Sequence, residues 1–340
     1  MNGSGLTTCL ALALSWALAS LSQSAFSQRM AVLARQEIDS LWQGSPVEFR
    51  LETSHSEDNA EGAFEIIRGD TLVVHACSES GLLYGAYFML RSQAMGDGCL
   101  CQTFGARQKI SQQPHTRLRA LHEPDGIGGL QEQGLLVPYA RRCAQVGINT
   151  VVIPTAELQR QDMKEANSIL QTYGISLLPD TMTSVPCLTL PSDPRQQEEL
   201  LFLAPRWQEI LAAHPNDCSR MIMSESVICQ PDVTVEGTTW SRHPMAVANW
   251  YAFGRLSWDP TLSPRQIAHE WLALSFTESP LFVQPMIEVM LASPNAGVAE
   301  VQRMIDIWSE MSRYVTPATF CQIGTSLDRQ LARLLEAQNH

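Results

Sequence analysis

The chain has 340 residues, of which 45% are apolar and 17% are charged, and its formal net charge at pH 7 is −12. This length is sufficient for two or three packed domains. The negative charge argues against nucleic acid and against an acidic membrane surface as partners. It does not exclude an anionic sugar, because one local arginine can outweigh a distant mean field.

Residues 1–27 are predicted to be a secretory signal peptide. Leu10 to Leu21 is an apolar stretch too short to span a bilayer, and Ala25 to Ser27 offers small residues where cleavage would occur. The mature protein is then expected to be periplasmic or extracellular, with no membrane association after signal removal. Because the first ten residues contain no Lys or Arg, an ordinary amphipathic helix is the alternative.

Nine cysteines and eight histidines are present. In an exported protein some of the cysteines could pair, and the alternative is buried apolar thiols. The spacing Cys99-x-Cys101 and the scatter of the other cysteines match no metal pattern, and the histidines form no ligand cluster. We therefore expect no metal and no cofactor.

Residues 28–115 are predicted to form a small α/β domain. An amphipathic helix is expected over 31–42, and a helix with an almost wholly apolar face over 81–91. Between them lie three short strands, over 47–53, 62–67 and 71–76.

Residues 116–237 alternate between strand and helix patterns. Strands are expected over 117–121, 148–153, 175–178 and 221–223, and helices over 133–146, 162–173 and 195–213. This alternation predicts a parallel β/α architecture with its chemistry at the carboxyl ends of the strands. Residues 238–340 are predicted to be a C-terminal α-helical domain.

The run from Trp240 to Phe276 is unusually aromatic. One helix is expected over 245–256, and a second begins at Ser263 with Pro264 in its first position. Its four tryptophans are Trp240, Trp250, Trp258 and Trp271. Such a density is typical of a helix-packing core, and the alternative is a platform that stacks on sugar rings.

The order of residues in this run resembles the C-terminal part of the family 67 alpha-glucuronidases. The matching positions are Trp240, His243, Pro244, Ala248, Asn249, Tyr251, Phe253, Gly254, Arg255, Leu256, Trp258, Pro260, Ile267, Ala268, Glu270 and Trp271. Residues 81–85 and 139–149 resemble the family's accessory N-terminal domain and the first half of its barrel. The resemblance implies removal of (4-O-methyl-)glucuronic acid from xylan-derived aldouronic acids by inversion.

The resemblance also implies a fold class: a small N-terminal α/β domain, an incomplete (β/α)8 barrel of the TIM type and a C-terminal helical region. A complete barrel needs about 250 residues, whereas 116–237 has room for about four β/α units. The C-terminal helices could cover the open barrel, a homodimer could close it, or the chain has an internal deletion relative to its relatives. We favour the deletion.

Glycoside hydrolysis usually needs two carboxyl groups, one as acid and one as base or nucleophile. The family's acid is a glutamate in an Asn-Ser-Glu-Gly motif after the fourth strand, and its best match is Glu225 in Met223-Ser224-Glu225-Ser226. The alternative is a solvated loop carboxylate. No base can be assigned, because Asp232 and Glu236 have no matching context. Without a base, the alternative function is an inactive glucuronoxylan-binding relative or a truncated gene product.

Three residues are candidates for substrate binding. Asp125 keeps its place in the loop after the first barrel strand, although Pro124 replaces the family's sugar-stacking tryptophan. Trp240 and His243 stand at the entrance of the aromatic run, where they would face a sugar. The alternative for His243 is a packing or capping role.

Overall fold

The computed structural model describes residues 29–52, 61–95, 104–105, 107–181, 187–193, 195, 199–215, 219–223, 232–234, 237–239 and 244–338. The predicted signal peptide lies outside these ranges and stays a prediction. Within them, no helix combines the length and apolar character needed to cross a membrane.

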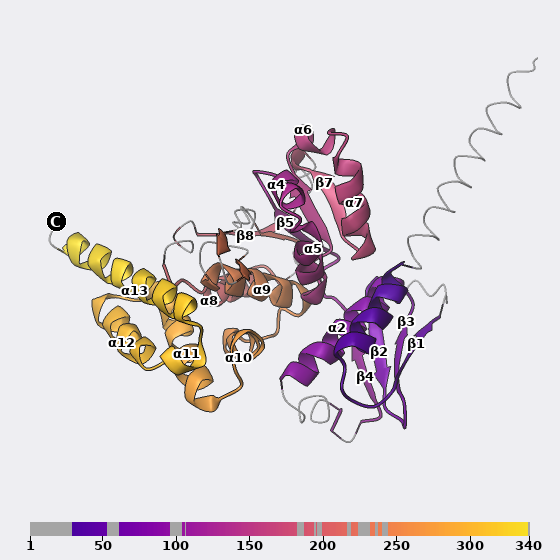
Figure 1. Cartoon of the computed structure of the whole chain (residues 1–340), viewed down its shortest axis with the longest axis horizontal. Helices are drawn as coiled ribbons and strands as arrows, with labels where there is room; N and C mark the ends of the chain where they lie inside the picture. The colour runs from indigo at the N-terminus through magenta and orange to yellow at the C-terminus, as the bar shows by residue number, and fades with distance from the viewer. Residues whose placement is uncertain are drawn as a thin grey trace, which may run out of the picture.

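A four-stranded sheet and two helices form the N-terminal part (Figure 1). Its elements are a helix over 29–41, β1 (Val47–Leu51), β2 (Phe64–Ile67), β3 (Leu72–Ala76), α2 (Glu79–Ala94) and β4 (Lys109–Gln112). The strand order is β1-β3-β2-β4, with β1 parallel to β3 and the other pairs antiparallel. The predicted strands and helices of this part are confirmed, and β4 is added to them.

Alternation along the strands puts one face of this sheet against α2. Ile66 and Val74 are fully buried, whereas Glu65 and His75 on the opposite face are only partly covered. A Cβ added to Gly85 of α2 would lie 2.5 Å from Cγ1 of Val74, so this glycine lets the helix approach the sheet closely.

The central part is a five-stranded, wholly parallel sheet. Its strands are β5 (Leu118–His122), β6 (Thr150–Ile153), β7 (Ser176–Pro179), β8 (Leu188–Leu190) and β9 (Arg220–Met223). They lie in the order β7-β6-β5-β9-β8, so β5, the first of these five strands in the sequence, is the middle strand of the sheet. The predicted parallel β/α architecture is confirmed.

The helices that connect these strands pack on one face of the sheet. They are α4 (Gly128–Glu132), α5 (Leu136–Gln145), α6 (Thr155–Leu158), α7 (Met163–Thr172) and α8 (Ala204–Ala213). Leu121, Val151 and Met221 share the main core with the buried side chains of α5, α7 and α8. The opposite face carries a separate small cluster around Ala120, Val152 and Ile222.

Three expectations for this part are corrected. The strand β8 was not predicted, so β9 is the fifth parallel strand rather than the fourth. The helix expected over 133–146 begins only at Leu136, as α5, because Gly134, with φ of 70°, lies in a turn that separates it from α4, a short helix that was not predicted. The helix expected over 195–213 begins only at Ala204, and the described residues before it are not α-helical.

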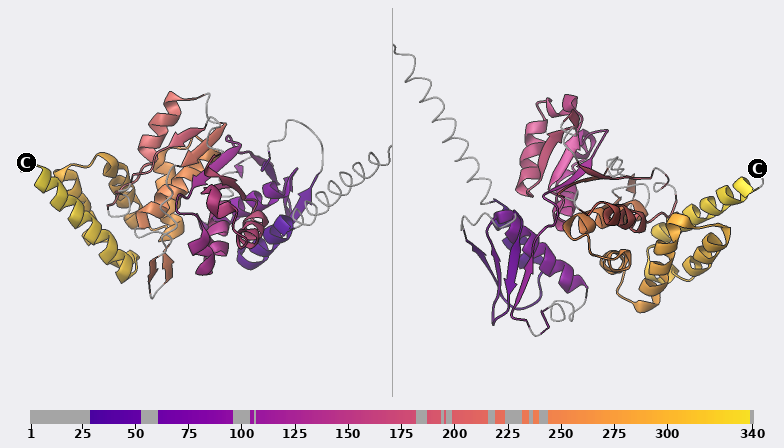
Figure 2. Two further views of the ribbon diagram at one scale, coloured as in Figure 1. Left: turned by 90° about the horizontal axis from the view of Figure 1, so that it is seen from above. Right: turned by 180° about the vertical axis from the view of Figure 1, so that it is seen from behind.

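The C-terminal part consists of helices (Figure 2). They are α9 (Pro244–Trp258), α10 (Pro264–Ser275), α11 (Pro280–Ala292), α12 (Val298–Ser309) and α13 (Pro317–Gln338), with short 3-10 turns η4 (Ser293–Asn295) and η5 (Ser312–Tyr314). In all views α13 lies at the opposite end of the molecule from the four-stranded sheet of the N-terminal part. A two-stranded hairpin, β10 (Asp232–Thr234) and β11 (Gly237–Thr239), precedes these helices.

The predicted start of α10 is confirmed in detail. Ser263 is its N-cap, Pro264 follows in the first turn, and the side chains of Ser263 and Gln266 form a reciprocal capping box. The N–H of Gln266 is satisfied by the Ser263 hydroxyl, and Pro264 has no N–H that would need a partner. These first positions of the helix therefore need no hydrogen bond from elsewhere in the fold.

The end of α9 joins the N-terminal and central parts. Trp258 packs edge-on against Tyr84 of α2, with ring centroids 5.1 Å apart. The buried guanidinium of Arg119 on β5 lies 5.4 Å from the Trp258 ring and donates to the carbonyl of Gly147. The cation on the aromatic ring thus joins α9 to the sheet, and the carbonyl contact joins β5 to the turn after α5.

Candidate functional site

The carboxyl ends of the five parallel strands meet at one edge of the sheet, which we call the carboxyl edge. His122 ends β5, Thr155 follows β6 after one residue, and Asp180 follows β7 directly. These three strands are neighbours in the sheet, so their terminal residues lie close together.

Asp180 and Thr155 form the tightest polar contact of this edge. The Thr155 hydroxyl donates to Oδ1 of Asp180 at 2.6 Å, and the Thr155 backbone N–H donates to the same oxygen at 3.2 Å. The hydroxyl hydrogen bond is the main cause that lowers the pKa of Asp180, slight burial opposes it, and the nearby His122 lowers it further. Asp180 is therefore held as a carboxylate beside an imidazole.

Glu157 holds the loop that follows β5. Its carboxylate accepts hydrogen bonds from the backbone N–H of Ile127 at 3.1 Å and of Gly128 at 2.7 Å, at the start of α4. Gly126, with φ of 76°, lies so close to this carboxylate that a Cβ there would overlap it. The hydrogen bonds of Glu157 thus fix the conformation of this loop.

Glu123 is a fully buried carboxylate one residue beyond β5. Its Oε1 accepts a hydrogen bond of 2.9 Å from the Tyr139 hydroxyl of α5. Since side chains alternate along a strand, Glu123 shares the helix-covered face with Leu121, away from His122. Its place in the fold is therefore structural.

Among the predicted substrate-binding residues, the structure describes Asp125. It is exposed in the turn that the Gly126 N–H closes on the carbonyl of Glu123 at 3.0 Å. This turn lies at the carboxyl edge, as predicted. Trp240 and His243 lie outside the described residues and stay predictions.

Glu225 also lies outside the described residues, but β9, which ends two residues before it, is described. β9 pairs with β5 on the side opposite β6. In a closed eight-stranded barrel the first strand pairs with the second and with the last. β9 lies directly beside the first of the parallel strands, as a last barrel strand would, whereas the Glu225 prediction rests on a fourth-strand position.

The aromatic run forms a core wherever it is described, in agreement with the first of its two interpretations. Trp250, Phe253, Trp258 and Trp271 are all buried. They belong to the main hydrophobic core of the molecule. No sugar-stacking surface is formed by these four rings.

The polar residues of the run join α9 to α10. Glu270 accepts hydrogen bonds from Nε of Arg255 at 2.8 Å and from the Tyr251 hydroxyl at 2.8 Å. Burial alone would raise the pKa of Glu270, but the charges of Arg255 and Arg91 and these hydrogen bonds outweigh it and lower the pKa to about 2. This is a buried structural ion pair.

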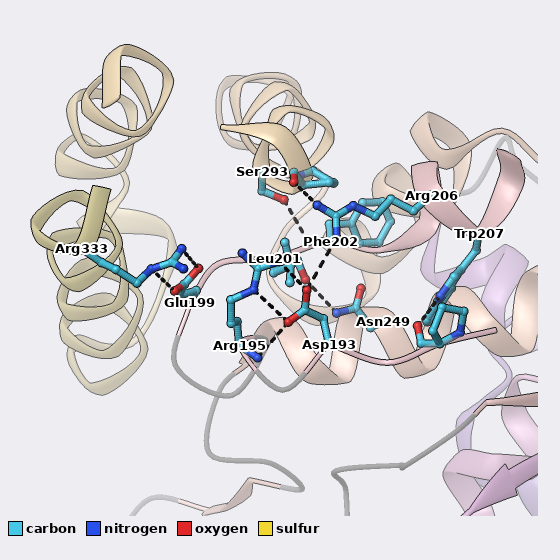
Figure 3. Close-up of polar contacts among 12 residues, drawn as sticks. Asp193, Arg195, Glu199, Leu201, Phe202, Arg206, Trp207, Asn249, Ser293 and Arg333 are labelled. Atoms are coloured by element: carbon cyan, nitrogen blue, oxygen red, sulfur yellow. Dashed lines mark hydrogen bonds and ion pairs between the residues drawn. The ribbon is translucent and has the colours of Figure 1, made fainter. Parts of the chain in front are cut away.

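The segment between β8 and α8 is held by side chains from distant helices (Figure 3). Asn249 of α9 accepts from the backbone N–H of Leu203 and donates to the carbonyl of Leu201, both at 2.7 Å. The Ser293 hydroxyl accepts from the N–H of Phe202 at 2.9 Å. The backbone of this apolar stretch is thus satisfied without a helix.

Ion pairs hold the same segment from outside. Arg333 of α13 contacts both carboxylate oxygens of Glu199 at 2.8 Å, and Arg195 makes a two-point contact with Asp193 (Figure 3). The Trp207 indole N–H donates to the carbonyl of Pro191 at 2.8 Å. The C-terminal helices therefore position the loop that leaves β8 at the carboxyl edge.

No metal-binding group stands out in the part of the chain that the structure describes. There, no three His, Cys, Asp or Glu side chains lie together as a metal site would require. Cys143, Cys187 and Cys321 are free thiols. Burial raises the pKa of the Cys143 thiol well above its usual value, so this cysteine behaves as a core residue.

Sequence reasoning named no role for His122, Thr155 or Asp180. Each stands at the end of a predicted strand, and consecutive parallel strands place such residues side by side. Applied to the sequence, that rule would have predicted that Thr155 and Asp180 lie close together.

Comparisons with known proteins agree with the resemblance in the sequence. Residues 241–296 match the model of the glycosyl hydrolase family 67 C-terminus. The probable alpha-glucuronidase A of Aspergillus fumigatus is 32% identical over 129 residues, which are 33% of this chain and 15% of that protein. The alpha-glucuronidase of Hypocrea jecorina is 30% identical over 111 residues, 29% of this chain and 13% of that protein. The matches thus span only about a seventh of the relatives' length.

Two solved structures share the fold over most of the chain. A family 115 4-O-methyl-alpha-glucuronidase with specificity for decorated arabinogalactans has a TM-score of 0.55, at 8% identity, over 88% of this chain and 68% of that one. A family 138 enzyme targeting pectin rhamnogalacturonan II has a TM-score of 0.52, at 8% identity, over 88% and 66%. At such identity the likeness concerns the fold alone.

The residues that match the family model include the described α9–α10 core. The comparisons therefore show that part of the chain is similar to the family 67 alpha-glucuronidases, with residues 241–296 matching the C-terminus of that family.

Proposed function

We propose that this protein is an alpha-glucuronidase-like glycoside hydrolase. It removes (4-O-methyl-)glucuronic acid from xylan-derived aldouronic acids at the carboxyl edge of its parallel sheet. The observation that carries this proposal is the family 67 match over residues 241–296, next to a β/α sheet of the kind that bears its chemistry at this edge.

In this proposal the sheet is part of an incomplete barrel. Every described crossover, from β5 to β6, β6 to β7 and β8 to β9, steps to the neighbouring strand in the same direction. Right-handed crossovers then place all helices on one face, which is the arrangement around a barrel. The second face, with Ala120, Val152 and Ile222, is the barrel interior, and β7 and β8 border the gap.

The chemistry follows the inverting scheme. Glu225 acts as the acid that protonates the leaving oxygen, and a second carboxylate activates water on the other face of the sugar ring. Asp125, Trp240 and His243 contact the sugar. The base is not assigned, since Asp180, Glu157 and Glu123 all accept hydrogen bonds from the protein itself.

The hydrogen bonds that these three carboxylates accept from the protein favour a second candidate function. An edge whose acidic side chains are engaged in structural contacts can bind an oligosaccharide without hydrolysing it. The second candidate is therefore a catalytically inactive relative that binds glucuronoxylan fragments.

Hydrolysis of purified aldouronic acids separates the two. The hydrolase releases glucuronate, the Glu225→Gln variant loses at least about 99% of that rate, and Glu132→Gln, an exposed carboxylate on α4, keeps it. Release that survives Glu225→Gln contradicts the acid assignment. Absence of release together with saturable binding of the oligosaccharide, measured by calorimetry, supports the second candidate. Absence of both rejects the site.

A further inference from the structure

The loop after β5 has an exposed tip and a buried second half. Asp125 is exposed at the tip, whereas Gly126, Ile127 and Gly128, which follow it, are buried. The position of Asp125 therefore depends on the contacts that hold the backbone on either side of it.

The backbone before Asp125 is held by the sheet and by α5. The N–H of Glu123 donates to the carbonyl of Val152 on β6 at 2.8 Å. The buried carboxylate of Glu123 accepts a hydrogen bond from the Tyr139 hydroxyl at 2.9 Å. This side of the loop thus continues the strand and owes its place to its own β/α unit.

The backbone after Asp125 is held by Glu157, which belongs to the next β/α unit. Oε1 of Glu157 accepts hydrogen bonds from the N–H groups of Gly128 at 2.7 Å and of Ile127 at 3.1 Å. Gly126 has φ of 76°, and a Cβ on it would overlap the Glu157 carboxylate. Without that carboxylate, a conformationally free glycine directly after Asp125 would lose the charge-assisted contacts beside it.

Glu157 is itself positioned by the loop after β7. Its helix α6 has only four residues, too few to be stable alone. The hydroxyl and the N–H of Thr155, the first residue of α6, bond to Asp180 at 2.6 and 3.2 Å. α4 and α6 lie at the same end of the parallel sheet (Figure 1). Contacts thus run from Asp180 through α6 and Glu157 to the loop of Asp125.

We propose that Glu157 is a positioning residue, which holds the loop after β5 so that Asp125 contacts a hydroxyl of the bound sugar. The proposal rests on the proposed function, in which Asp125 binds the aldouronic acid. It gives the Glu157 carboxylate, which takes no part in the inverting scheme, a role in substrate affinity. Loss of Glu157 should weaken binding of the ground state and of the transition state alike.

The test measures binding of an aldouronic acid by calorimetry and its hydrolysis by release of glucuronate, with the full-length protein. Binding is measured in a Glu225→Gln background, so that the ligand is not consumed. Glu157→Ala should raise the dissociation constant and KM about tenfold, since one charge-assisted contact is equivalent to about a factor of ten. It should leave kcat nearly unchanged.

Two further variants serve as controls. Glu157→Gln keeps an oxygen that can accept from the N–H groups of Ile127 and Gly128, and it should restore most of the affinity. Glu132→Ala removes an exposed carboxylate from α4, the helix whose first N–H Glu157 binds, and should change neither binding nor KM.

A double variant separates positioning from a general loss of structure. In an Asp125→Ala background the sugar contact is already absent, so adding Glu157→Ala should weaken binding by less than about twofold, because effects that act through one contact are not additive. Hydrogen exchange needs no sugar, and the amides of Ile127 and Gly128 should exchange faster in Glu157→Ala. Near-UV circular dichroism checks that the fold persists.

Three results would overturn the positioning role and leave the proposed function intact. The first is native affinity and KM in Glu157→Ala. The second is full additivity of Glu157→Ala and Asp125→Ala, since Glu157 would then not act through Asp125. The third is unchanged exchange of the Ile127 and Gly128 amides. A native chain that neither binds nor hydrolyses the aldouronic acid rejects the proposed function, and the positioning of Asp125 for a sugar is rejected with it.

Discussion

Gly254 of α9 lies directly against Val146 at the end of α5. A Cβ on Gly254 would be 2.5 Å from Cγ2 of Val146 and 2.8 Å from its carbonyl oxygen. The first atom belongs to a stiff β-branched side chain and the second to the backbone, so neither can move aside cheaply. The close approach of α9 to the end of α5 thus explains why position 254 of the aromatic run is a glycine.

Gly254→Ala should destabilise the protein. Alanine favours a helix by up to about 1 kcal/mol over glycine, but overpacking costs about 1–3 kcal/mol, and contact with the backbone places the cost at the upper end. Urea denaturation followed by circular dichroism measures the difference. Gly129→Ala in α4, where a Cβ meets nothing within 4 Å, should cause no loss. Equal stability of the Gly254 variant and the native chain would refute the close approach.

Asn249→Ala should destabilise the segment before α8, because it removes the side chain that bonds two of its backbone groups. It removes one acceptor and one donor and leaves the N–H of Leu203 and the carbonyl of Leu201 buried without partners. Each such group costs about 1–3 kcal/mol, so we expect a loss of about 2–4 kcal/mol in unfolding free energy.

Hydrogen exchange distinguishes this effect from general destabilisation. The Leu203 amide should exchange faster in Asn249→Ala, whereas Asn249→Asp, which keeps the acceptor, should protect it partly. Gln302→Ala on the exposed side of α12 is the control. Unchanged protection of Leu203 in Asn249→Ala would show that the amide does not hold this segment.

The same segment shows what the sequence could not reveal. Leu200 to Leu203 is an apolar run that reads as helix, yet its N–H groups are satisfied by Asn249 and Ser293, which lie 46 and 91 residues further along the chain. Such distant partners leave no local pattern. The start of α10 was predictable because Ser263 and Gln266 are three residues apart and satisfy each other.

The order of the strands in the parallel sheet could not be predicted from the sequence either. Periodicity indicated the parallel strands, but the three residues of β8 are too few for a period, and the pairing of β9 with β5 is a tertiary fact. At the carboxyl edge, by contrast, the loop containing Asp125 was placed correctly. Its exposed carboxylate follows directly from its position after a predicted strand.

Glu270→Gln should remove a stabilisation that depends on pH. Since the pKa of Glu270 is about 2 in the folded protein against 4.5 for an ordinary glutamate, its contribution is present in full above about pH 5. It is lost as the pH falls from there towards 2. The shift is equivalent to on the order of 3 kcal/mol.

The measurement compares unfolding free energies of the native chain and the variant at several pH values. The difference should be large at pH 7 and should shrink steadily below pH 5. Glu288→Gln, which breaks an exposed ion pair with Arg265, should cost less than about 1 kcal/mol at any pH. A difference for Glu270→Gln that stays constant down to pH 2 would contradict the assigned ion pair.

Thr155→Val should raise the pKa of Asp180. The substitution keeps the shape of the side chain and the backbone N–H but removes the hydroxyl that lies 2.6 Å from the carboxylate, which is the largest cause of the lowered pKa. His122→Gln should raise it less, because the imidazole is a smaller cause. Carboxyl carbon NMR titration measures the pKa of Asp180 in each protein.

Thr172→Val, whose hydroxyl bonds only within α7 to the carbonyl of Ser168, is the matched control. An Asp180 pKa that is the same in Thr155→Val and in the native chain would contradict the contact. The result also bears on the carboxyl edge as a site, since a carboxylate fixed by Thr155 stays ionised in mildly acidic solution. Asp180 then carries a negative charge beside His122. This charge repels any anionic sugar that approaches the carboxyl edge from the β7 side.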